Sequence, residues 1–290
     1  MDIVICTAAK DCFMIRRNIK YISSFLHENS TYIYIITNRK NHCLFSNSWR
    51  KKYNVIMLDE NKIIDGLSIN SVQKVLDKHF TCNKYSGWYF QQFLKMGFAL
   101  TKYAKDDYLI WDADTIPLKN LLFFKDGKYY FTIKTEYHKP YFDTLENLIG
   151  VGKIKSYSFI AEHMPINVNI MKELIAHIEN LNCNGKNWFE KIIYSTSGSD
   201  EQAFSEFETY GTYCSIKYND IFVPNILKTL REAGKLYGRY ILEKDFNDLK
   251  KSNYDTASFE LRDIPKYPRK ILYWYERVVV SILRRLKIIK

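Results

Sequence analysis

The sequence predicts an α/β fold in which a mostly parallel, Rossmann-like sheet is flanked by helices. Short apolar runs at 3–6, 32–37 and 53–58 have the length of buried strands. A helical pattern, with apolar residues three or four positions apart, separates the first two runs over 11–29. Strands that alternate with helices form parallel sheets covered on both faces. The pattern over residues 1–115 therefore predicts that this first half of the domain has a Rossmann-like α/β fold.

The following elements continue this alternation. Apolar spacing predicts helices over 69–80 and 88–103, and a buried strand follows at 108–111. Further strands are expected at 129–134 and 156–161. Further helices are expected at 167–180, 187–194 and 199–210.

The chain has no internal repeat and no Ser- or Gly-rich linker, so we expect one continuous domain over 1–265 and a tail over 266–290. Within the domain, 1–115 and 116–265 form two halves.

Hydrophobic residues make up 47% of the 290 residues, which excludes a wholly disordered chain. No stretch of about 18 residues lacks charge, so no membrane-spanning helix is expected. Six scattered cysteines without a CxxC pair, and an opening segment without a basic leader, indicate a cytoplasmic protein.

The positive charge is concentrated in the tail. The chain has 43 Lys and Arg against 32 Asp and Glu, a net charge of +11, and 266–290 contain eight basic residues against one acidic residue. Nucleic-acid-binding domains usually present a basic stripe on their folded face. Because the rest of the chain has only a small positive excess, no nucleic-acid partner is expected.

Residues directly after the first three strands are candidates for ligand binding. Ligands of open α/β sheets gather at the carboxyl ends of the strands. This rule selects Thr7 and Ala8 after the first strand, Asn38 after the second and Asp59 after the third. These residues are candidates because of their position at the strand ends, since their side chains do not indicate a particular ligand.

Two carboxylates, Asp112 and Asp114, follow the buried strand at 108–111, and Pro117 ends the strand ladder shortly afterwards. In an extended backbone, side chains two residues apart point to the same side, so both could hold one divalent ion. Mn²⁺ and Mg²⁺ prefer carboxylate and phosphate oxygens. Two aspartates separated by one residue, a DxD motif, also occur commonly as the polar end of a strand without any metal. Here the motif follows an apolar strand of the α/β sheet, and this position favours a site for Mn²⁺ or Mg²⁺.

Four motifs resemble those of a sparsely characterised bacterial family of GT-A-type glycosyltransferases, in order and spacing, over 1–225. The motifs are SGWYFQQFLKM at 86–96, DDYLIWDADTIPL at 106–118, EHMPIN at 162–167 and SEFETYG at 205–211. The resemblance implies a GT-A-like fold, with 1–115 binding the nucleotide sugar and 116–265 on the acceptor side. It also implies a divalent metal held by Asp112 and Asp114, and transfer of a sugar to a cell-surface glycan.

The helix predicted over 88–103 carries two further candidates. Gln92 and Lys95 are three residues apart and share one helix face. Lys95 could contact a phosphate or the ribose, and Gln92 could contact a hydroxyl. From the residues alone, a solvent-exposed face for both is an equally good interpretation, and the resemblance favours a place in the pocket. His163 lies in the motif that resembles the acceptor-side segment; a lone His is more often structural, and it remains a candidate for holding diphosphate or acceptor. The predicted nucleotide-sugar site comprises Thr7, Ala8, Asn38, Gln92, Lys95, Asp112 and His163.

An inverting sugar transfer needs a carboxylate base near the acceptor hydroxyl. The segment around SEFETYG offers Asp200, Glu201, Glu206 and Glu208. On a single helix Glu201 and Glu208 share one face, and Glu206 points away from them. We favour Glu206, because it lies in the matching motif, and place Asp200 second. Some of these acids could instead cap a helix, and a retaining enzyme needs no such base.

The tail has the pattern of a basic amphipathic helix. Tyr273, Trp274 and Tyr275 suit the boundary between lipid headgroups and acyl chains. Each basic residue near an anionic leaflet contributes about 1 kcal/mol. We therefore expect peripheral attachment to the inner face of the cytoplasmic membrane. The alternative is a helix that docks on the protein's own core or on a partner.

The favoured function is a metal-dependent glycosyltransferase that uses a nucleotide-diphosphate sugar, preferably a UDP-sugar. Its acceptor would be a hydroxyl of lipooligosaccharide, capsule or a similar lipid-linked glycan. A nucleotidyltransferase also needs a metal at a strand end, although 6–12 lack the usual Gly-rich phosphate loop. A non-catalytic glycan-binding module at the membrane surface is the other alternative, and it should show no metal-dependent nucleotide binding.

Overall fold

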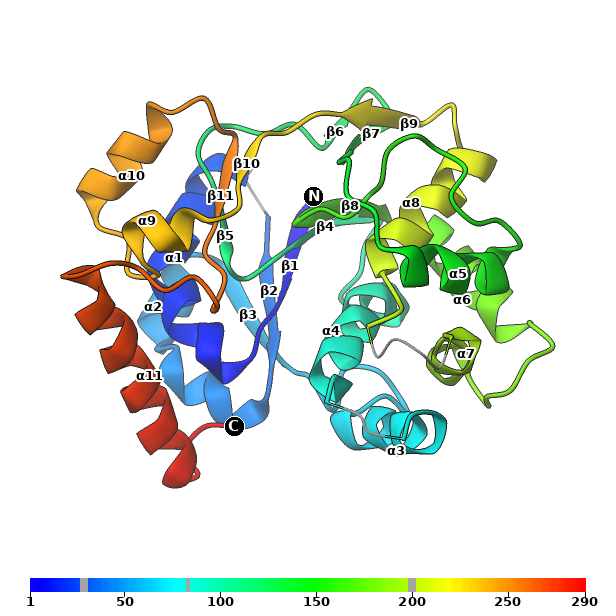
Figure 1. The fold of residues 1–290 in the computed structure, drawn as a ribbon, viewed down its shortest axis with the longest axis horizontal. Coiled ribbons are helices and arrows are strands. Elements are labelled where there is room, and N and C mark those ends of the chain that lie inside the picture. Colours follow the sequence, from blue (N-terminus) through cyan, green and yellow to red (C-terminus); the bar gives the residue numbers. More distant parts are fainter. Residues whose placement is uncertain (27–30, 82–83, 198–201) are drawn as a thin grey trace. The chain divides into compact units, whose positions relative to one another are not determined.

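A computed structural model of the chain describes residues 1–26, 31–81, 84–197 and 202–290. Helices flank a mostly parallel sheet, which confirms the predicted α/β fold (Figure 1). Among the described residues, the largest sheet has the strand order β3-β2-β1-β4-β8. Its first strands, β1 (Asp2–Cys6), β2 (Ile33–Thr37) and β3 (Val55–Asp59), pair in parallel. Every residue of β1 and β2 is buried, which explains their continuous apolar runs.

The chain divides into two compact units, each built from segments that are distant in sequence. Unit 1 comprises Met1–Asp59, Trp111–Leu122 and Leu227–Lys290. Unit 2 comprises Glu60–Ile110 and Phe123–Ile226.

Unit 1 contains β1, β2 and β3 together with a small second sheet. In that sheet, β5 (Thr115–Pro117) pairs antiparallel with β11 (Thr256–Ser258), and β11 pairs in parallel with β10 (Thr229–Leu230). The helices of unit 1 are α1 (Ala9–Leu26), η1 (Arg39–Leu44), α2 (Asn47–Lys52), α9 (Ala233–Tyr237), α10 (Glu243–Lys250) and α11 (Arg269–Arg285).

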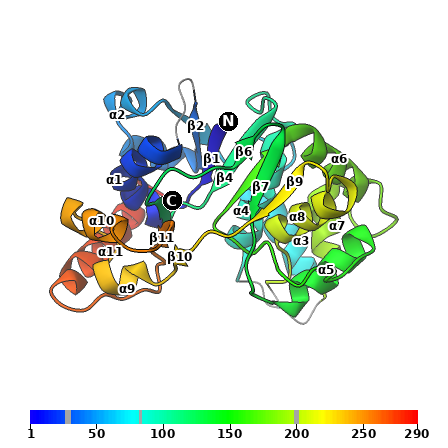
Figure 2. The ribbon, with the colours of Figure 1, turned by 90° about the horizontal axis from the view of Figure 1, so that it is seen from above.

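Helix α1 packs on elements from the far end of the chain. Its Tyr21 ring stacks on Phe246 of α10, with ring centroids 3.7 Å apart. The same core cluster contains Met14 of α1 and Ile116 of β5. Figure 2 shows α1 beside α10 and α11. The helix expected at 11–29 is thus confirmed through Leu26, and 27–30 lie outside the described residues.

Helix α11 confirms the predicted amphipathic tail helix and docks on the core of unit 1 by one face. Val280 packs in a small cluster with Ala9 and Ile289, which Phe13 and Leu283 border. A second, apolar stripe of α11 remains exposed to solvent. This exposed stripe consists of Ile271, Trp274, Tyr275, Val278 and Ile282. In the described part of the chain, no helix combines the length and apolarity that a membrane span requires.

Unit 2 surrounds β8 (His163–Asn167) and most of β4 (Asp107–Trp111) with helices. A small sheet of order β6-β7-β9 contains β6 (Phe124–Lys125), β7 (Lys128–Thr132) and β9 (Phe222–Asn225). The helices of unit 2 are α3 (Ile69–His79), α4 (Ser86–Gly97), η2 (Phe98–Leu100), α5 (Lys139–Ile149), α6 (Val168–Glu179), α7 (Trp188–Ser195) and α8 (Glu206–Lys217).

Helix α8 is the central helix of unit 2. All residues from 206 to 215 are buried, so the helix is covered on every side. Both ribbon views place it among α4, α5 and α6 (Figures 1 and 2). The helix begins after Ser205, whose hydroxyl accepts a hydrogen bond from the Glu208 N–H (3.2 Å).

Two expected elements of unit 2 differ from the structure. The strand predicted over 156–161 is wrong: this segment forms only an isolated bridge between Ser158 and Lys134. Its apolar pattern arises because Phe159 is buried beneath α8 without joining a sheet. The helix expected over 199–210 begins only at Glu206, and 198–201 lie outside the described residues.

Candidate metal centre and active-site residues

Asp112 and Asp114 lie in the turn between β4 and β5, within unit 1. The Thr115 N–H donates to the Asp112 carbonyl (3.1 Å), and the Asp114 carbonyl accepts from the Phe259 N–H (2.8 Å). The indole N–H of Trp111 donates to the Thr115 carbonyl (2.8 Å). The extended backbone expected through this motif is therefore wrong, because these hydrogen bonds fold it into a tight turn anchored beside β11.

The electrostatics of this turn fit a divalent cation. Burial is the largest cause that raises the pKa of Asp114 to about 7. The neighbouring carboxylates of Asp112, Asp11 and Glu260 contribute to the same rise, and the positive charge of Arg239 opposes it. The carboxylates thus repel one another, and a bound divalent cation would relieve that repulsion. Within the described ranges, no three or more His, Cys, Asp or Glu side chains are placed so that they could hold one metal ion together. Asp112 and Asp114 could therefore hold Mn²⁺ or Mg²⁺ only with water or substrate phosphate completing the shell.

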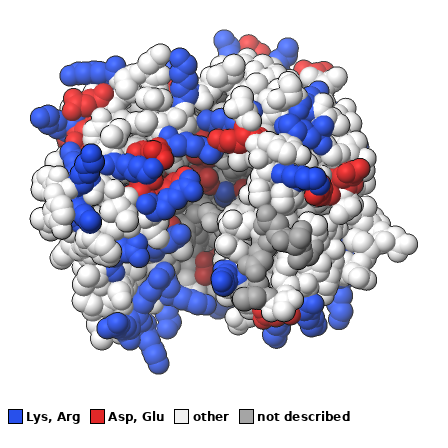
Figure 3. All heavy atoms as spheres, in the orientation of Figure 1, with Lys and Arg blue, Asp and Glu red and all other residues white. Residues whose placement is uncertain are grey.

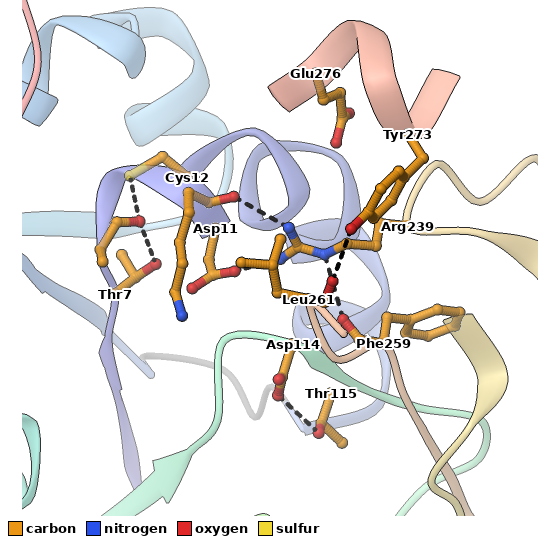
Figure 4. Close-up of polar contacts among 12 residues, drawn as sticks. Thr7, Asp11, Cys12, Asp114, Thr115, Arg239, Phe259, Leu261, Tyr273 and Glu276 are labelled. Atoms are coloured by element: carbon orange, nitrogen blue, oxygen red, sulfur yellow. Dashed lines mark hydrogen bonds and ion pairs between the residues drawn. The ribbon is translucent and has the colours of Figure 1, made fainter. Parts of the chain in front are cut away.

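Arg239 is the buried cation beside this carboxylate cluster. It is 4% exposed, and its guanidinium forms an ion pair with Asp11 in the first turn of α1. It also donates to the Phe259 carbonyl (3.3 Å) and the Lys10 carbonyl (3.2 Å). Figure 4 shows the guanidinium held from several sides, with Asp114 close by. Sequence reasoning missed this pair because Asp11 and Arg239 are 228 residues apart.

The predicted strand-end residues lie along one edge of the sheet in unit 1. Cys6 is in register with Ile36, so Thr7 and Asn38 follow adjacent parallel strands. The Thr7 hydroxyl donates to the Ala8 carbonyl (3.3 Å), where α1 begins. The Asn38 side chain caps η1 by accepting from the Lys40 N–H (3.2 Å). Their shared edge is confirmed, and their role in binding a nucleotide sugar stays a prediction.

In unit 2, three of the predicted residues form one buried polar cluster. Lys95 of α4 and Glu206 of α8 are 4% and 3% exposed, and Lys95 Nζ lies 2.8 Å from Glu206 Oε1. In the amide orientation that satisfies its neighbours, Gln92 donates to the Glu206 carboxylate and accepts from the indole N–H of Trp88 (3.2 Å). Lys95 also lies 4.6 Å from the centre of the Phe207 ring. The pairing of Gln92 and Lys95 on one helix face is thus observed, with Glu206 as their shared partner.

The other acids of the segment around α8 differ in their surroundings. The Glu208 carboxylate accepts from the Phe159 N–H (2.7 Å), and burial raises its pKa. This bond ties α8 to the loop between α5 and β8, which is a structural role. Asp200 and Glu201 lie outside the described residues. The assignment of a catalytic base to Glu206 or Asp200 stays a prediction.

His163 of β8 lies in the core of unit 2. Its Nε2 is 2.7 Å from the Thr132 hydroxyl, and its ring meets Phe123 edge to face. Burial lowers the pKa of His163 to about 4, so the ring is neutral near pH 7. The structure shows a hydrogen-bonded core histidine, and a contact with diphosphate or acceptor stays a prediction.

Comparison with known proteins gives matches among solved structures only. No protein-family model matches the sequence, and a search of curated proteins finds no match. The galactosyltransferase LgtC, in complex with donor and acceptor sugar analogs, is 10% identical with a TM-score of 0.45, over 97% of this chain and 95% of that chain. Mouse xyloside xylosyltransferase 1 is 14% identical with a TM-score of 0.46, over 89% of this chain and 96% of that chain. The mannosyltransferase Ktr4p from S. cerevisiae is 10% identical with a TM-score of 0.45, over 71% of this chain and 65% of that chain.

Proposed function

We propose that the chain is a metal-dependent, GT-A-type glycosyltransferase. The observation that carries this proposal is the acidic turn of Asp112 and Asp114 after β4, where a parallel α/β sheet ends. The raised pKa of Asp114 supports it, because mutual repulsion of carboxylates is a property of sites that accept a divalent cation. The four sequence motifs that resemble the GT-A family support the same reaction class.

Each group at this turn has a role in the proposed reaction. Asp112 and Asp114 would hold Mn²⁺ or Mg²⁺, and the ion would neutralise charge that develops on the departing nucleotide diphosphate. Arg239 adds a fixed positive charge beside them, because Asp11 and two backbone carbonyls hold its guanidinium in place. Such preorganised charge stabilises a leaving group without reorganisation during the reaction.

For the catalytic base, the nucleotide-sugar contacts, the donor and the acceptor, our proposals follow the sequence analysis. We propose Glu206, and Asp200 second, as the base that takes the proton of the acceptor hydroxyl. The proposed nucleotide-sugar contacts are Thr7, Ala8, Asn38, Gln92, Lys95, Asp112 and His163. A UDP-sugar is the favoured donor, and lipooligosaccharide, capsule or a similar glycan carries the acceptor hydroxyl.

We also propose that the enzyme works on the inner face of the cytoplasmic membrane. The support is the exposed stripe of α11, whose apolar residues lie beside basic ones on a helix docked by its opposite face. Trp274→Ser/Ile282→Ser should reduce sedimentation with phosphatidylglycerol vesicles at least fivefold. Leu236→Ser, which removes an exposed apolar side chain from α9, is the matched control. Equal sedimentation of all three proteins would contradict membrane binding by this stripe.

The test of the enzymatic proposal is release of UDP from UDP-sugars in the presence of Mn²⁺ and a glycan acceptor. Asp112→Asn and Asp114→Asn should each lower the rate at least 100-fold. Asp248→Asn removes an exposed carboxylate of α10 in the same unit and should leave the rate unchanged. Pyrophosphate release from a nucleoside triphosphate would instead identify a nucleotidyltransferase. Glycan binding without any turnover would identify a binding module.

A further inference from the structure

A cavity of about 330 Å³ lies between the first turn of α1 and α11, entirely within unit 1. Its volume is at the lower end of the range for small-molecule sites, about 300–1,000 Å³. The charged side chains that line it are Lys10, Arg239, Glu276, Arg277, Arg284 and Arg285. Phe13, Tyr273 and Val280 supply part of its apolar wall.

The cavity has an excess of positive charge that the protein itself does not neutralise. Glu276 is already paired with Arg17 (2.5 Å), and Arg239 is paired with Asp11. Across the described ranges, none of the four other cations has a carboxylate within 4 Å. These four are Lys10, Arg277, Arg284 and Arg285, and Arg277 alone among them is ordered by a hydrogen bond to the Tyr273 hydroxyl (2.7 Å). A cavity with several free cations and an apolar wall suits a ligand that joins an anion to an apolar group.

The cavity also has a defined position relative to the exposed stripe of α11. With 3.6 residues per turn, Arg277, Ser281 and Arg284 lie on the flank between the docked face and that stripe. When an amphipathic helix inserts its apolar stripe into a bilayer, its flanks come to the level of the lipid phosphates. The space-filling view shows Lys and Arg gathered where α11 and the C terminus lie, at the lower left (Figure 3).

We propose that this cavity binds a phosphate ester, supplied by the headgroup of an anionic membrane lipid. Arg284 and Arg285 would contact the phosphate oxygens, since guanidinium groups form paired hydrogen bonds with phosphate, and Lys10 would add a point charge from α1. The inference rests on the proposed membrane attachment and adds a headgroup-selective site to it. Free phosphate esters share the same chemistry, so the test separates the two sources.

The first arm of the test measures affinity for soluble short-chain lipids below their micelle concentration by calorimetry. Dihexanoyl phosphatidylglycerol should bind at least ten times more tightly than dihexanoyl phosphatidylcholine and than glycerol 3-phosphate. Equal affinity for phosphatidylglycerol and glycerol 3-phosphate would overturn the lipid source. Displacement of bound phosphatidylglycerol by UDP would also overturn the proposal, because the cavity would then belong to the donor site.

The second arm compares two variants that each remove two positive charges from unit 1. Arg284→Gln/Arg285→Gln should weaken phosphatidylglycerol binding at least tenfold. Lys51→Gln/Lys52→Gln, at the exposed end of α2, should change it less than twofold. Equal weakening in both variants would mean general electrostatic attraction and would overturn the site. Asp112→Asn/Asp114→Asn should bind the lipid normally, so failure of the transferase proposal is distinguishable from failure of this one.

Discussion

Asp114 combines an acidic environment with a partly buried carboxyl group, and this determines how the candidate metal centre should respond to pH. Its pKa is raised to about 7 by burial and by neighbouring carboxylates. A carboxyl whose pKa is raised in the folded state binds protons more tightly there than in the unfolded state. In the metal-free protein, this group therefore lowers stability as pH rises from about 4 to about 7.

The same shift predicts a pH dependence of metal binding. Mn²⁺ competes with the proton on Asp114, so its dissociation constant should rise by up to about tenfold per pH unit below pH 7. Above pH 8 the affinity should be constant. Calorimetric titration of Mn²⁺ between pH 5.5 and 8.5 measures this directly. A flat profile over that range would show that Asp114 does not take part, and Asp114→Asn should flatten the profile.

The buried pair of Lys95 and Glu206 makes a second prediction at this scale. Removing one partner leaves the other charge without compensation in the core, at a cost of about 3–5 kcal/mol in the free energy of unfolding. Lys95→Met and Glu206→Gln should each show such a loss in urea unfolding, and the double variant should lose less than the sum. Strictly additive losses would contradict the pairing. A stable Glu206→Gln protein without transfer activity would instead favour the proposed base.

Single residues also show what sequence reasoning can reach. Asp112 and Asp114 became candidates because their signal is local, two carboxylates directly after an apolar strand, and their role as metal ligands stays a prediction. Gln92 and Lys95 were identifiable as neighbours on a helix, but their partner Glu206 was not, because no local rule joins α4 to α8. Arg239 was missed for the same reason. A buried ion pair between distant segments leaves no periodic signal in a sequence.

Among the elements, α8 makes the sharpest prediction about packing. A Cβ at Gly211 would lie 2.4 Å from the Phe159 ring, and that ring is fully buried. Gly211→Ala should therefore reduce the free energy of unfolding by about 1–3 kcal/mol through overpacking. Gly87→Ala in α4 is the control, because its Cβ would meet nothing within 4 Å. An exposed helical Gly→Ala change should stabilise by up to about 1 kcal/mol, so urea unfolding should show opposite signs. Stabilisation by both changes would contradict the close packing of α8.

Elements with strong periodicity were predictable, and short irregular ones were not. The helices α3, α6 and α7 match the expected ranges closely because their apolar faces repeat over several turns, whereas α4 ends at Gly97 and not at 103 as expected. The 156–161 segment was misinterpreted as a strand because burial of a loop produces a similar apolar pattern. The strands β10 and β11 have only two or three residues each, too few for alternation to be detected.

For the whole molecule, the important feature is that each unit is assembled from distant segments. The carboxylates of the candidate metal centre lie in unit 1, with Arg239 contributed from the last part of the chain. The polar cluster of Lys95 and Glu206 lies in unit 2. Periodicity predicted the first three strands, β4 and several of the helices, in their order along the chain. It could not show which distant segments share a unit, because that depends on tertiary packing.

The central claim is that Asp112 and Asp114 bind a divalent metal that supports nucleotide-diphosphate binding. The most direct measurement is thermal unfolding with UDP in the presence and absence of Mn²⁺. Ligand at about a hundred times its dissociation constant stabilises the native state by about 2.7 kcal/mol. We expect a rise in Tm when UDP and Mn²⁺ are present together, and none in Asp112→Asn/Asp114→Asn. An equal rise without Mn²⁺, an equal rise in the double variant, or no rise at all would contradict the account.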